Sequence, residues 1–293
     1  MMLLLQLFID GLTSGALYAL MAVGFAIIYN GTRILHLAHG AVFTFGGYTL
    51  YVLAIALHLP MALALVGAVL ACSCLGVALD VAVYRPLRRR NSSAAAILVA
   101  SIGILTLFQA LYALVFGTDT LNLHQGPLPT FEVGDVIVTA LHIVAAAVTI
   151  VVFPLLQLFL TRSRYGRAIR ALADNPRLAV VRGIDTERLY ILIFALGSGL
   201  AGIAVGLIAF DLGVTPDMGF AVLFVALVAV IVGGVGYLPG AAAGGFLLGL
   251  LQKLSLWQLS ARWQDVIVFG ALIAFLVFRP QGIFGHMLVT RHV

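Results

Sequence analysis

Long apolar blocks follow one another along almost the whole chain and are separated by short polar breaks. A helix needs about 20 apolar residues to cross the hydrocarbon core of a bilayer. Eight blocks approach that length: 11–29, 41–58, 61–83, 94–116, 136–160, 189–210, 219–236 and 264–278. The alternation of polar and apolar residues that is typical of outer-membrane strands does not occur. We therefore expect an all-α, polytopic membrane protein with eight or nine transmembrane helices, forming a single permease domain over residues 1–293.

A further apolar segment, residues 239–256, is rich in glycine and begins with Pro239. Its glycines and the one before it recur every four residues in two rows: Gly236, Gly240 and Gly244, then Gly245 and Gly249. This spacing bares one face of a helix for close approach to a neighbour. Proline removes a backbone donor, and the groups it frees must face protein or water. We expect a broken helix, which either crosses the membrane or is re-entrant.

Composition supports the membrane assignment. Hydrophobic residues make up 63% of the 293 residues and charged residues only 9%, which is too little polar surface to cover a soluble globule.

The N-terminal sequence MMLLLQLFIDGLTSG carries Asp10 where a signal peptide would be apolar, so we interpret it as the retained start of the first helix. Cys72 and Cys74 lie two residues apart in an apolar block, and we expect them to pack rather than to bind metal.

Basic residues concentrate in residues 161–188, TRSRYGRAIRALADNPRLAVVRGIDTER, which hold seven of the sixteen Lys and Arg residues and three acidic ones. We name these residues the basic segment. An Arg at the bilayer centre costs about 3 kcal/mol or more, so the segment must lie in water. Its cations lie beside membrane helices and lack interleaved aromatic residues, which argues against nucleic-acid binding.

The distribution of cations also predicts orientation, because cytoplasmic loops are enriched in Lys and Arg. We expect the basic segment, Arg33 and the run at 85–90 to be cytoplasmic, and the acidic loop 117–135 to be external. The N-terminus would then be outside. The C-terminus, with Arg279 and Arg291, would be cytoplasmic if residues 239–256 cross the membrane, and external if they do not.

Local signals within the basic segment predict a short helix from Pro176 to Arg182. Asp174 or Asn175 suits its N-cap, and Gly183 suits the left-handed position after its end. So short a helix is marginal in water alone, which favours docking onto a partner over a loop that only enforces topology. The candidate coupling residues are Arg170, Asp174, Asn175, Pro176, Leu178, Ala179, Val181 and Gly183.

Histidine and serine residues offer weaker candidates for chemistry. His36 and His39 in ILHLAHG are one helical turn apart, but no third ligand is near in sequence, which favours hydrogen bonding over a metal site. Ser198 in LGSGLAG would need His39 as a base to act as a nucleophile, and a small residue at a tight helix contact is the commoner role. The sequence contains no G-x-x-x-x-G-K-[ST] phosphate loop, so any ATP hydrolysis belongs to another polypeptide.

Three motifs stand in order along nearly the full chain: GLTSGALYALMAVGFAIIY with LAHGAVFTFGGY, then YGRAIRALADNPRLAVVRGIDTER, then VGGVGYLPGAAAGGFLLG with RPQGIFG. Together they resemble the permease subunits of branched-chain amino acid ABC importers of the LivH type. That family commonly has Asn-Phe before Ala-His-Gly, where this chain has His36 and Leu37. If this turn lines the pathway, the substrate preference differs from the usual branched-chain set.

The resemblance implies a transport subunit without catalytic residues or cofactors, which moves branched-chain or related amino acids across the bacterial inner membrane by alternating access. Its implied partners are a second related permease or a second copy, two cytoplasmic ATP-binding subunits, an external solute-binding protein and membrane lipid, but no nucleic acid. Residues 165–183 would be the coupling element that sits on the ATP-binding subunit.

Two other functions stay open from the residues alone. An ion-coupled secondary transporter would need ionisable groups at mid-membrane, whereas Asp80 and Asp265 lie near the ends of their spans and no buried ion pair is expected. An intramembrane hydrolase would need Ser198 and His39 at hydrogen-bond distance. For transport, we expect helix ends and freed backbone groups to contact the solute. The candidate pathway residues are His39, Gly40, Gly236 and Gly240.

Overall fold

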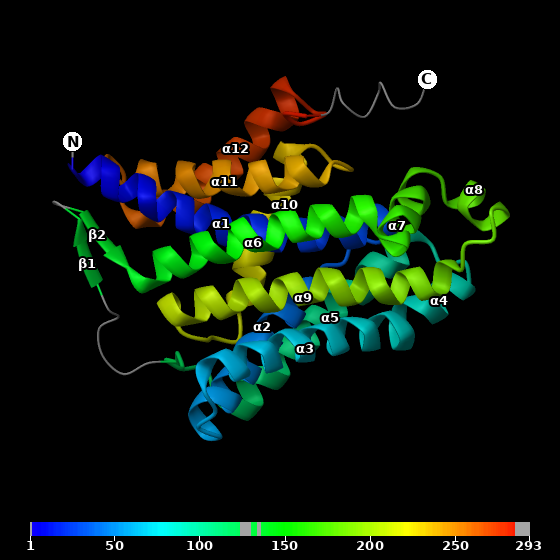
Figure 1. The fold of residues 1–293 in the computed structure, drawn as a ribbon, viewed down its shortest axis with the longest axis horizontal. Coiled ribbons are helices and arrows are strands. Elements are labelled where there is room, and N and C mark those ends of the chain that lie inside the picture. Colours follow the sequence, from blue (N-terminus) through cyan, green and yellow to red (C-terminus); the bar gives the residue numbers. More distant parts are fainter. Residues whose placement is uncertain (1, 124–129, 134–135, 285–293) are drawn as a thin grey trace.

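The computed structural model describes residues 2–123, 130–133 and 136–284, which form a bundle of long helices (Figure 1). The helices are α1 (Met2–Thr32), α2 (His39–Tyr51), α3 (Met61–Leu79), α4 (Arg85–Arg89), α5 (Ala94–Phe116), α6 (Ala140–Arg162), α7 (Arg164–Asp174), α8 (Pro176–Val181), α9 (Thr186–Leu212), α10 (Met218–Gly233), α11 (Leu238–Ser255) and α12 (Gln264–Phe278). Two π-helical stretches continue α2 and α3, namely η1 (Val52–Ala56) and η2 (Asp80–Tyr84), and a 3-10 turn, η3 (Ala261–Trp263), precedes α12.

Seven helices of the described residues are long and apolar enough to cross a membrane, and the bent pair α10–α11 would make eight if counted as one span. The predicted all-α, polytopic fold is therefore confirmed. One predicted span was too long: residues 136–139 form strand β2 (Val136–Thr139), which pairs antiparallel with β1 (Thr130–Val133). The β-branched run VIVT favours a strand. Helix α6 begins only after Thr139, whose side chain and backbone form a capping box with His142.

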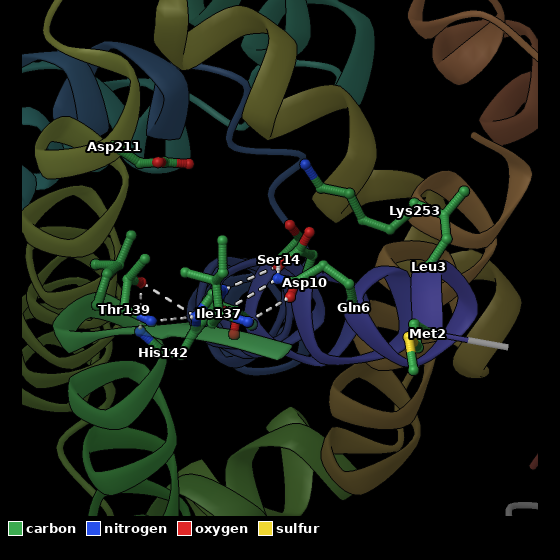
Figure 2. A pocket seen from close by; sticks show the side chains of 12 residues that line it. Met2, Leu3, Gln6, Asp10, Ser14, Ile137, Thr139, His142, Asp211 and Lys253 are labelled. Carbon is green, nitrogen blue, oxygen red and sulfur yellow. Dashed lines mark hydrogen bonds and ion pairs between the residues drawn. The ribbon is translucent and has the colours of Figure 1, made fainter. Parts of the chain in front are cut away.

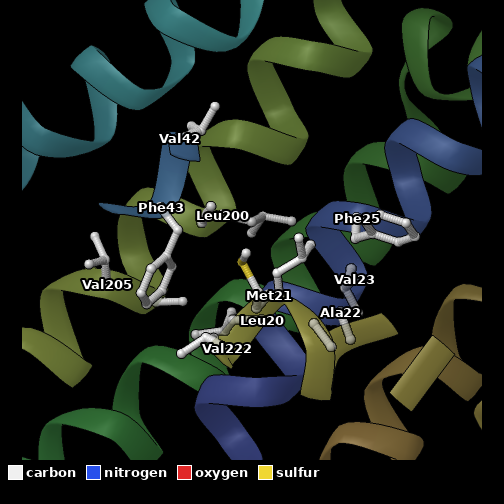
Figure 3. Packing of buried hydrophobic residues seen from close by; sticks show 14 of the residues in the cluster. Leu20, Met21, Ala22, Val23, Phe25, Val42, Phe43, Leu200, Val205 and Val222 are labelled. Atoms are coloured by element: carbon white, nitrogen blue, oxygen red, sulfur yellow. The ribbon is translucent and has the colours of Figure 1, made fainter. Parts of the chain in front are cut away.

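Helix α1 forms the centre of the bundle, and its second half is buried almost without interruption. Its side chains meet those of α2, α9 and α10 in one packed core (Figure 3). Labelled members of this core are Leu20, Met21, Ala22, Val23, Phe25, Val42, Phe43, Leu200, Val205 and Val222. By contrast, α5 and α12 keep apolar side chains such as Leu114 and Phe278 largely exposed, as expected of surfaces that face lipid.

Glycine allows α11 to lie directly against α1, antiparallel and along most of its length. A Cβ atom built on Gly11 would lie 3.1 Å from the Cα atom of Leu250, and one on Gly15 would lie 2.8 Å from that of Phe246. On the facing helix, a Cβ atom at Gly245 would overlap the backbone of Ala19. The 18 residues of α11 rise about 27 Å, close to the thickness of a hydrocarbon core.

The break before α11 separates Gly236 from the other glycines of the two predicted rows. Helices α10 and α11 meet at 120° across residues 234–237. Gly236 lies in this turn with φ 97°, a conformation that favours glycine, so its predicted place on a helix face was wrong. A Cβ atom at Gly240 would overlap the carbonyl oxygen of Gly233, and one at Gly244 would overlap that of Ala229. The predicted close contact is therefore present at Gly240 and Gly244, and its partner is α10.

The basic residues gather at one end of the bundle, as the cation distribution predicts. The Arg33 guanidinium donates to the Ala173 carbonyl oxygen at 2.9 Å, and Arg85 pairs with Glu187 at 2.7 Å. Beyond α12, Ile283 N–H donates to the Val232 carbonyl oxygen at 2.8 Å, which brings the segment after Arg279 to this end as well. We name this end of the bundle, which carries Arg33, Arg85 and the segment after Arg279, the basic face. Asp135 and Arg291, assigned to opposite sides by the sequence, lie outside the described residues.

The opposite end of the bundle carries the N-terminal part of α1, the hairpin and the ends of α9 and α11. Asp10, Asp211 and Lys253 line one cavity there (Figure 2). Helix α11 runs from the turn at residues 234–237 to this end, where Lys253 lies near its last residue, and α12 follows it. The side of the membrane on which the C-terminus lies therefore stays a prediction.

We predict that Gly240→Leu will destabilise the bundle, because its side chain would have to enter the backbone contact between α10 and α11. Overpacking of this kind costs about 1–3 kcal/mol or more. The matched control is Gly270→Leu in α12, where a Cβ atom meets nothing within 4 Å. Thermal unfolding of the detergent-solubilised proteins would measure both, and equal midpoints would contradict the packing claim.

Candidate functional site

The basic segment folds as two helices, of which the sequence predicted one. Helix α7 (Arg164–Asp174) begins at Ser163, whose hydroxyl oxygen accepts from the Gly166 N–H at 2.8 Å. Its apolar side chains Ile169 and Leu172 are buried, while its arginines face outward. The amphipathic spacing of RYGRAIRALAD is typical of a surface helix, but the sequence prediction considered only the charge of this stretch.

Helix α8 (Pro176–Val181) has the predicted start and stop signals. The Asn175 side chain accepts from the Leu178 N–H at 3.0 Å, so Asn175 is the cap and Asp174 instead ends α7. Pro176 occupies the first helical position, and Gly183 has φ 78°. The short predicted helix is thus present and ends one residue earlier than expected, at Val181.

The apolar strip of α8 is only partly available to a partner. Leu178, Val180 and Val181 are 52%, 58% and 81% exposed. Ala179 is only 3% exposed and belongs to the core of the chain, so its prediction as a docking contact was wrong. Helix α8 packs against α7, and the Ile184 N–H donates to the Ala179 carbonyl oxygen at 3.1 Å, which closes the end of the helix.

A cluster of charged side chains connects the end of the basic segment to η2 and α4. Arg88 donates to the fully buried Asp80 at 2.6 Å and lies 4.3 Å from the centre of the Tyr190 ring, while Glu187 pairs with Arg85. The expectation that the spans hold no buried ion pair was wrong. The π-helical stretch at 80–84 changes the helical phase between Asp80 and Arg88, which a simple helical spacing does not reveal.

A cavity of about 450 Å³ opens at the basic face between α7 and the α10–α11 turn. Arg170 and Asp174, predicted for coupling, line it together with Gly236, predicted for the pathway. Its polar lining also includes Asn30, Gln157, Thr161, Arg167 and Tyr237. The fold thus joins residues of the two candidate sites, which lie about 60 positions apart in the chain.

His39 and Gly40 lie elsewhere, in the packed start of α2. His39 contacts Gly24 of α1 and the rings of Phe25 and His36. A Cβ atom at Gly40 would lie 2.7 Å from the Gly219 carbonyl oxygen, so the first turns of α2 and α10 touch through glycine. The four candidate pathway residues therefore do not form one lining: Gly236 borders the cavity at the basic face, and the others pack between helices.

His36, which stands where the family commonly has Asn, takes part in a chain of hydrogen bonds. His36 Nδ1 lies 2.8 Å from the Tyr84 hydroxyl oxygen, which lies 2.9 Å from Ser101 Oγ, and that oxygen accepts from the Ala38 N–H. Burial, and secondly the neighbouring His39, lower the pKa of His36 well below its usual range, so the ring is neutral. This chain of hydrogen bonds joins the α1–α2 turn to η2 and α5.

The described residues contain no group of three or more His, Cys, Asp or Glu side chains arranged to hold a metal ion. Ser198 Oγ and both ring nitrogens of His39 are buried without a hydrogen-bond partner among these residues. The pairing that a Ser198 hydrolase requires is therefore not formed there.

Comparison with known proteins decides the family. Residues 7–277 match the family described as branched-chain amino acid transport system / permease component. The chain belongs to this family. The BraD permease of the high-affinity branched-chain amino acid transport system of Pseudomonas aeruginosa is 32% identical, covering 98% of this chain and 97% of BraD. The corresponding LivH permease of Escherichia coli K12 is 33% identical, with the same coverage.

More distant matches add less. The LsrC permease of the autoinducer 2 import system of Escherichia coli is 30% identical over 44% of this chain. A solved structure, PsaBC from Streptococcus pneumoniae in complex with Fab, aligns with a TM-score of 0.54 at 17% identity, covering 100% of this chain and 96% of that one. It supports the fold alone. As a member of the permease family the chain is a transport component and not an enzyme, and the hydrolase and secondary-transporter alternatives are not favoured.

We predict that Asp80→Asn will destabilise the permease, because it leaves the Arg88 guanidinium partly buried without its closest anion. Breaking one partner of a buried pair costs on the order of 3 kcal/mol. The matched control is Asp185→Asn, which removes a carboxylate from the exposed pair with Arg188 and should change stability little. Thermal unfolding in detergent would compare the two, and an unchanged midpoint for Asp80→Asn would refute this role.

Proposed function

We propose that this chain is the permease subunit of an ABC importer that moves branched-chain or related amino acids across the bacterial inner membrane by alternating access. The observation that carries the proposal is the match over 98% of the chain to permeases of high-affinity branched-chain amino acid systems. The absence of a phosphate-loop motif from the sequence is consistent with ATP hydrolysis on separate subunits.

The partners we propose are a second related permease or a second copy of this chain, two ATP-binding subunits and an external solute-binding protein. Helix α8 would dock on an ATP-binding subunit through Leu178, Val180 and Val181, with Arg170, Asp174 and Asn175 nearby. Three apolar side chains exposed beside arginines support this, because an aqueous surface rarely leaves such a strip uncovered without a partner. Gly183 and Pro176 would fix how α8 is presented.

We propose further that the basic face is cytoplasmic, with the N-terminus outside and the C-terminus inside. The support is the positive-inside rule applied to cations that gather at one end of the bundle. Impermeant labelling of a cysteine at position 165 in intact cells would contradict this orientation.

We propose that the solute pathway passes His39 and Gly40 at the start of α2, and Gly236 and Gly240 at the α10–α11 turn. Two features support it. The first turns of α2 and α10 touch each other through Gly40 and Gly219, and the α10–α11 turn borders the cavity at the basic face. Breaks of this kind supply helix-end amides for a carboxylate and free carbonyl oxygens for an ammonium group. Because His39, Gly40 and Gly240 are packed between helices, their backbone groups would contact the solute only after alternating access separates these helices.

Uptake measurements test the proposal. Proteoliposomes holding this chain with its partner subunits should accumulate labelled leucine only with internal ATP and external binding protein. We expect Val181→Asp to reduce uptake at least about tenfold, because an unpaired charge enters an apolar contact. Val181→Ile is the matched control, since it keeps the apolar surface. Failure of the unmodified complex to transport any branched-chain amino acid would overturn the function, and full activity of Val181→Asp would overturn the docking role.

A further inference from the structure

A second cavity, of about 690 Å³, lies at the end of the bundle opposite the basic face. It lies where the first part of α1, strand β2, the start of α6 and the ends of α9 and α11 meet (Figure 2). Its volume is in the range of pockets that take small molecules. We name it the outer cavity, and no residue that the sequence proposed for the pathway lines it.

One wall of the outer cavity is fixed by hydrogen bonds. Asp10 accepts from Gln6 Nε2 at 3.0 Å and lies 3.0 Å from His142 Nε2. Gln6 also accepts from the Ile137 N–H at 3.0 Å and donates to the Ile137 carbonyl oxygen. His142 Nδ1 in turn accepts from the Thr139 N–H. The Asp10 carboxylate is therefore already engaged by the protein.

The side chains of Asp211 and Lys253 differ from that of Asp10, because neither forms an ion pair or a hydrogen bond with any described residue. They come from different helices, at the end of α9 and near the end of α11. Figure 2 shows the Lys253 side chain extending across the cavity toward the Asp211 carboxylate, with Ser14 below the space between them. Two opposite charges thus line one cavity without pairing with each other.

The remaining lining suits an aliphatic group. Met2, Leu3, Ile137 and Leu141 border the same cavity as the two charges. An α-amino acid with a branched side chain has this combination of a carboxylate, an ammonium group and a compact apolar part. Charge-assisted hydrogen bonds to fixed partners are the strong ones, so a pair of them would select the zwitterion.

We propose that the outer cavity is an entry site for a zwitterionic amino acid, which places its carboxylate at Lys253 and its ammonium group at Asp211. The proposal rests on the proposed function and on the outward orientation of this face, and it assigns the first contact of the solute within the permease. The opposed charges provide recognition that the apolar spans lack. Ser14 lines the same cavity, and no contact with the solute is assigned to it.

Protection from alkylation tests this site in the assembled transporter in lipid nanodiscs. Ser14→Cys would report occupancy by its rate of reaction with a maleimide, in a chain that also carries Cys74→Ala because Cys74 is exposed. Leucine should slow the reaction. Leucinamide lacks the carboxylate and 4-methylpentanoate lacks the ammonium group, and each should need at least about tenfold higher concentration for equal protection, the loss expected for one charge-assisted hydrogen bond.

Charge-neutralising variants then assign each contact. In Lys253→Gln, protection by leucine should fall to the level of leucinamide, and in Asp211→Asn to the level of 4-methylpentanoate. The matched control is Arg262→Gln, which removes one charge from the same end of the bundle outside the cavity lining and should leave protection by leucine unchanged. Equal alkylation rates without ligand would show that the variants are folded alike.

The outcomes separate this inference from the function on which it rests. Absence of protection by leucine, or protection that Lys253→Gln and Asp211→Asn leave unchanged, would overturn the entry site even if the unmodified complex transports leucine. Protection by leucine that loses its preference for the zwitterion only in these two variants would support it. A complex that transports no branched-chain amino acid would instead overturn the proposed function.

Discussion

Backbone contact through glycine between α1, α10 and α11 is the constraint on which the rest of the structure depends. Helices in lipid gain little from burying apolar side chains, so they associate through close packing of small residues. Gly11, Gly15 and Gly245 bring α1 and α11 together, and Gly240 and Gly244 bring α10 against α11. Because these contacts join backbone to backbone, they leave little room for the helices to slide past one another.

This packing holds both ends of the molecule in fixed relation. At the basic face, α7 is tied to the end of α1 through Arg33, and α9 is tied to α4 through Glu187 and Arg85. At the other end, α1, α9 and α11 line the outer cavity. A movement imposed on α8 is therefore expected to reach the outer cavity as a rigid-body displacement of helices that span the bundle.

Sequence reasoning succeeded where the signal was local. Apolar block lengths predicted the helices, and the caps at Asn175 and Gly183 predicted α8, because capping depends on residues three or four positions away. The gathering of cations at one face followed from the cost of charge in lipid. Family motifs predicted the permease family that the comparisons then showed.

The errors concern contacts that regular helical spacing does not predict. The burial of Ala179 depends on how α8 packs against α7, and the pairing of Asp80 with Arg88 depends on a π-helical change of phase. The opposition of Asp211 and Lys253 arises only when the ends of α9 and α11 are brought to one cavity. Hydrophobic periodicity carries no information on which helix ends meet, so the sequence alone did not predict this site.

The central claim is that the basic face delivers the movement of an ATP-binding subunit to the packed helices through α8. Photo-crosslinking from position 181 in the assembled transporter tests it most directly, with position 114 of α5 as the control because Leu114 is also highly exposed. The account predicts a crosslink from position 181 to the ATP-binding subunit, changed in yield by ATP, and none from position 114. Crosslinks from position 181 only to lipid or to the external binding protein would contradict it.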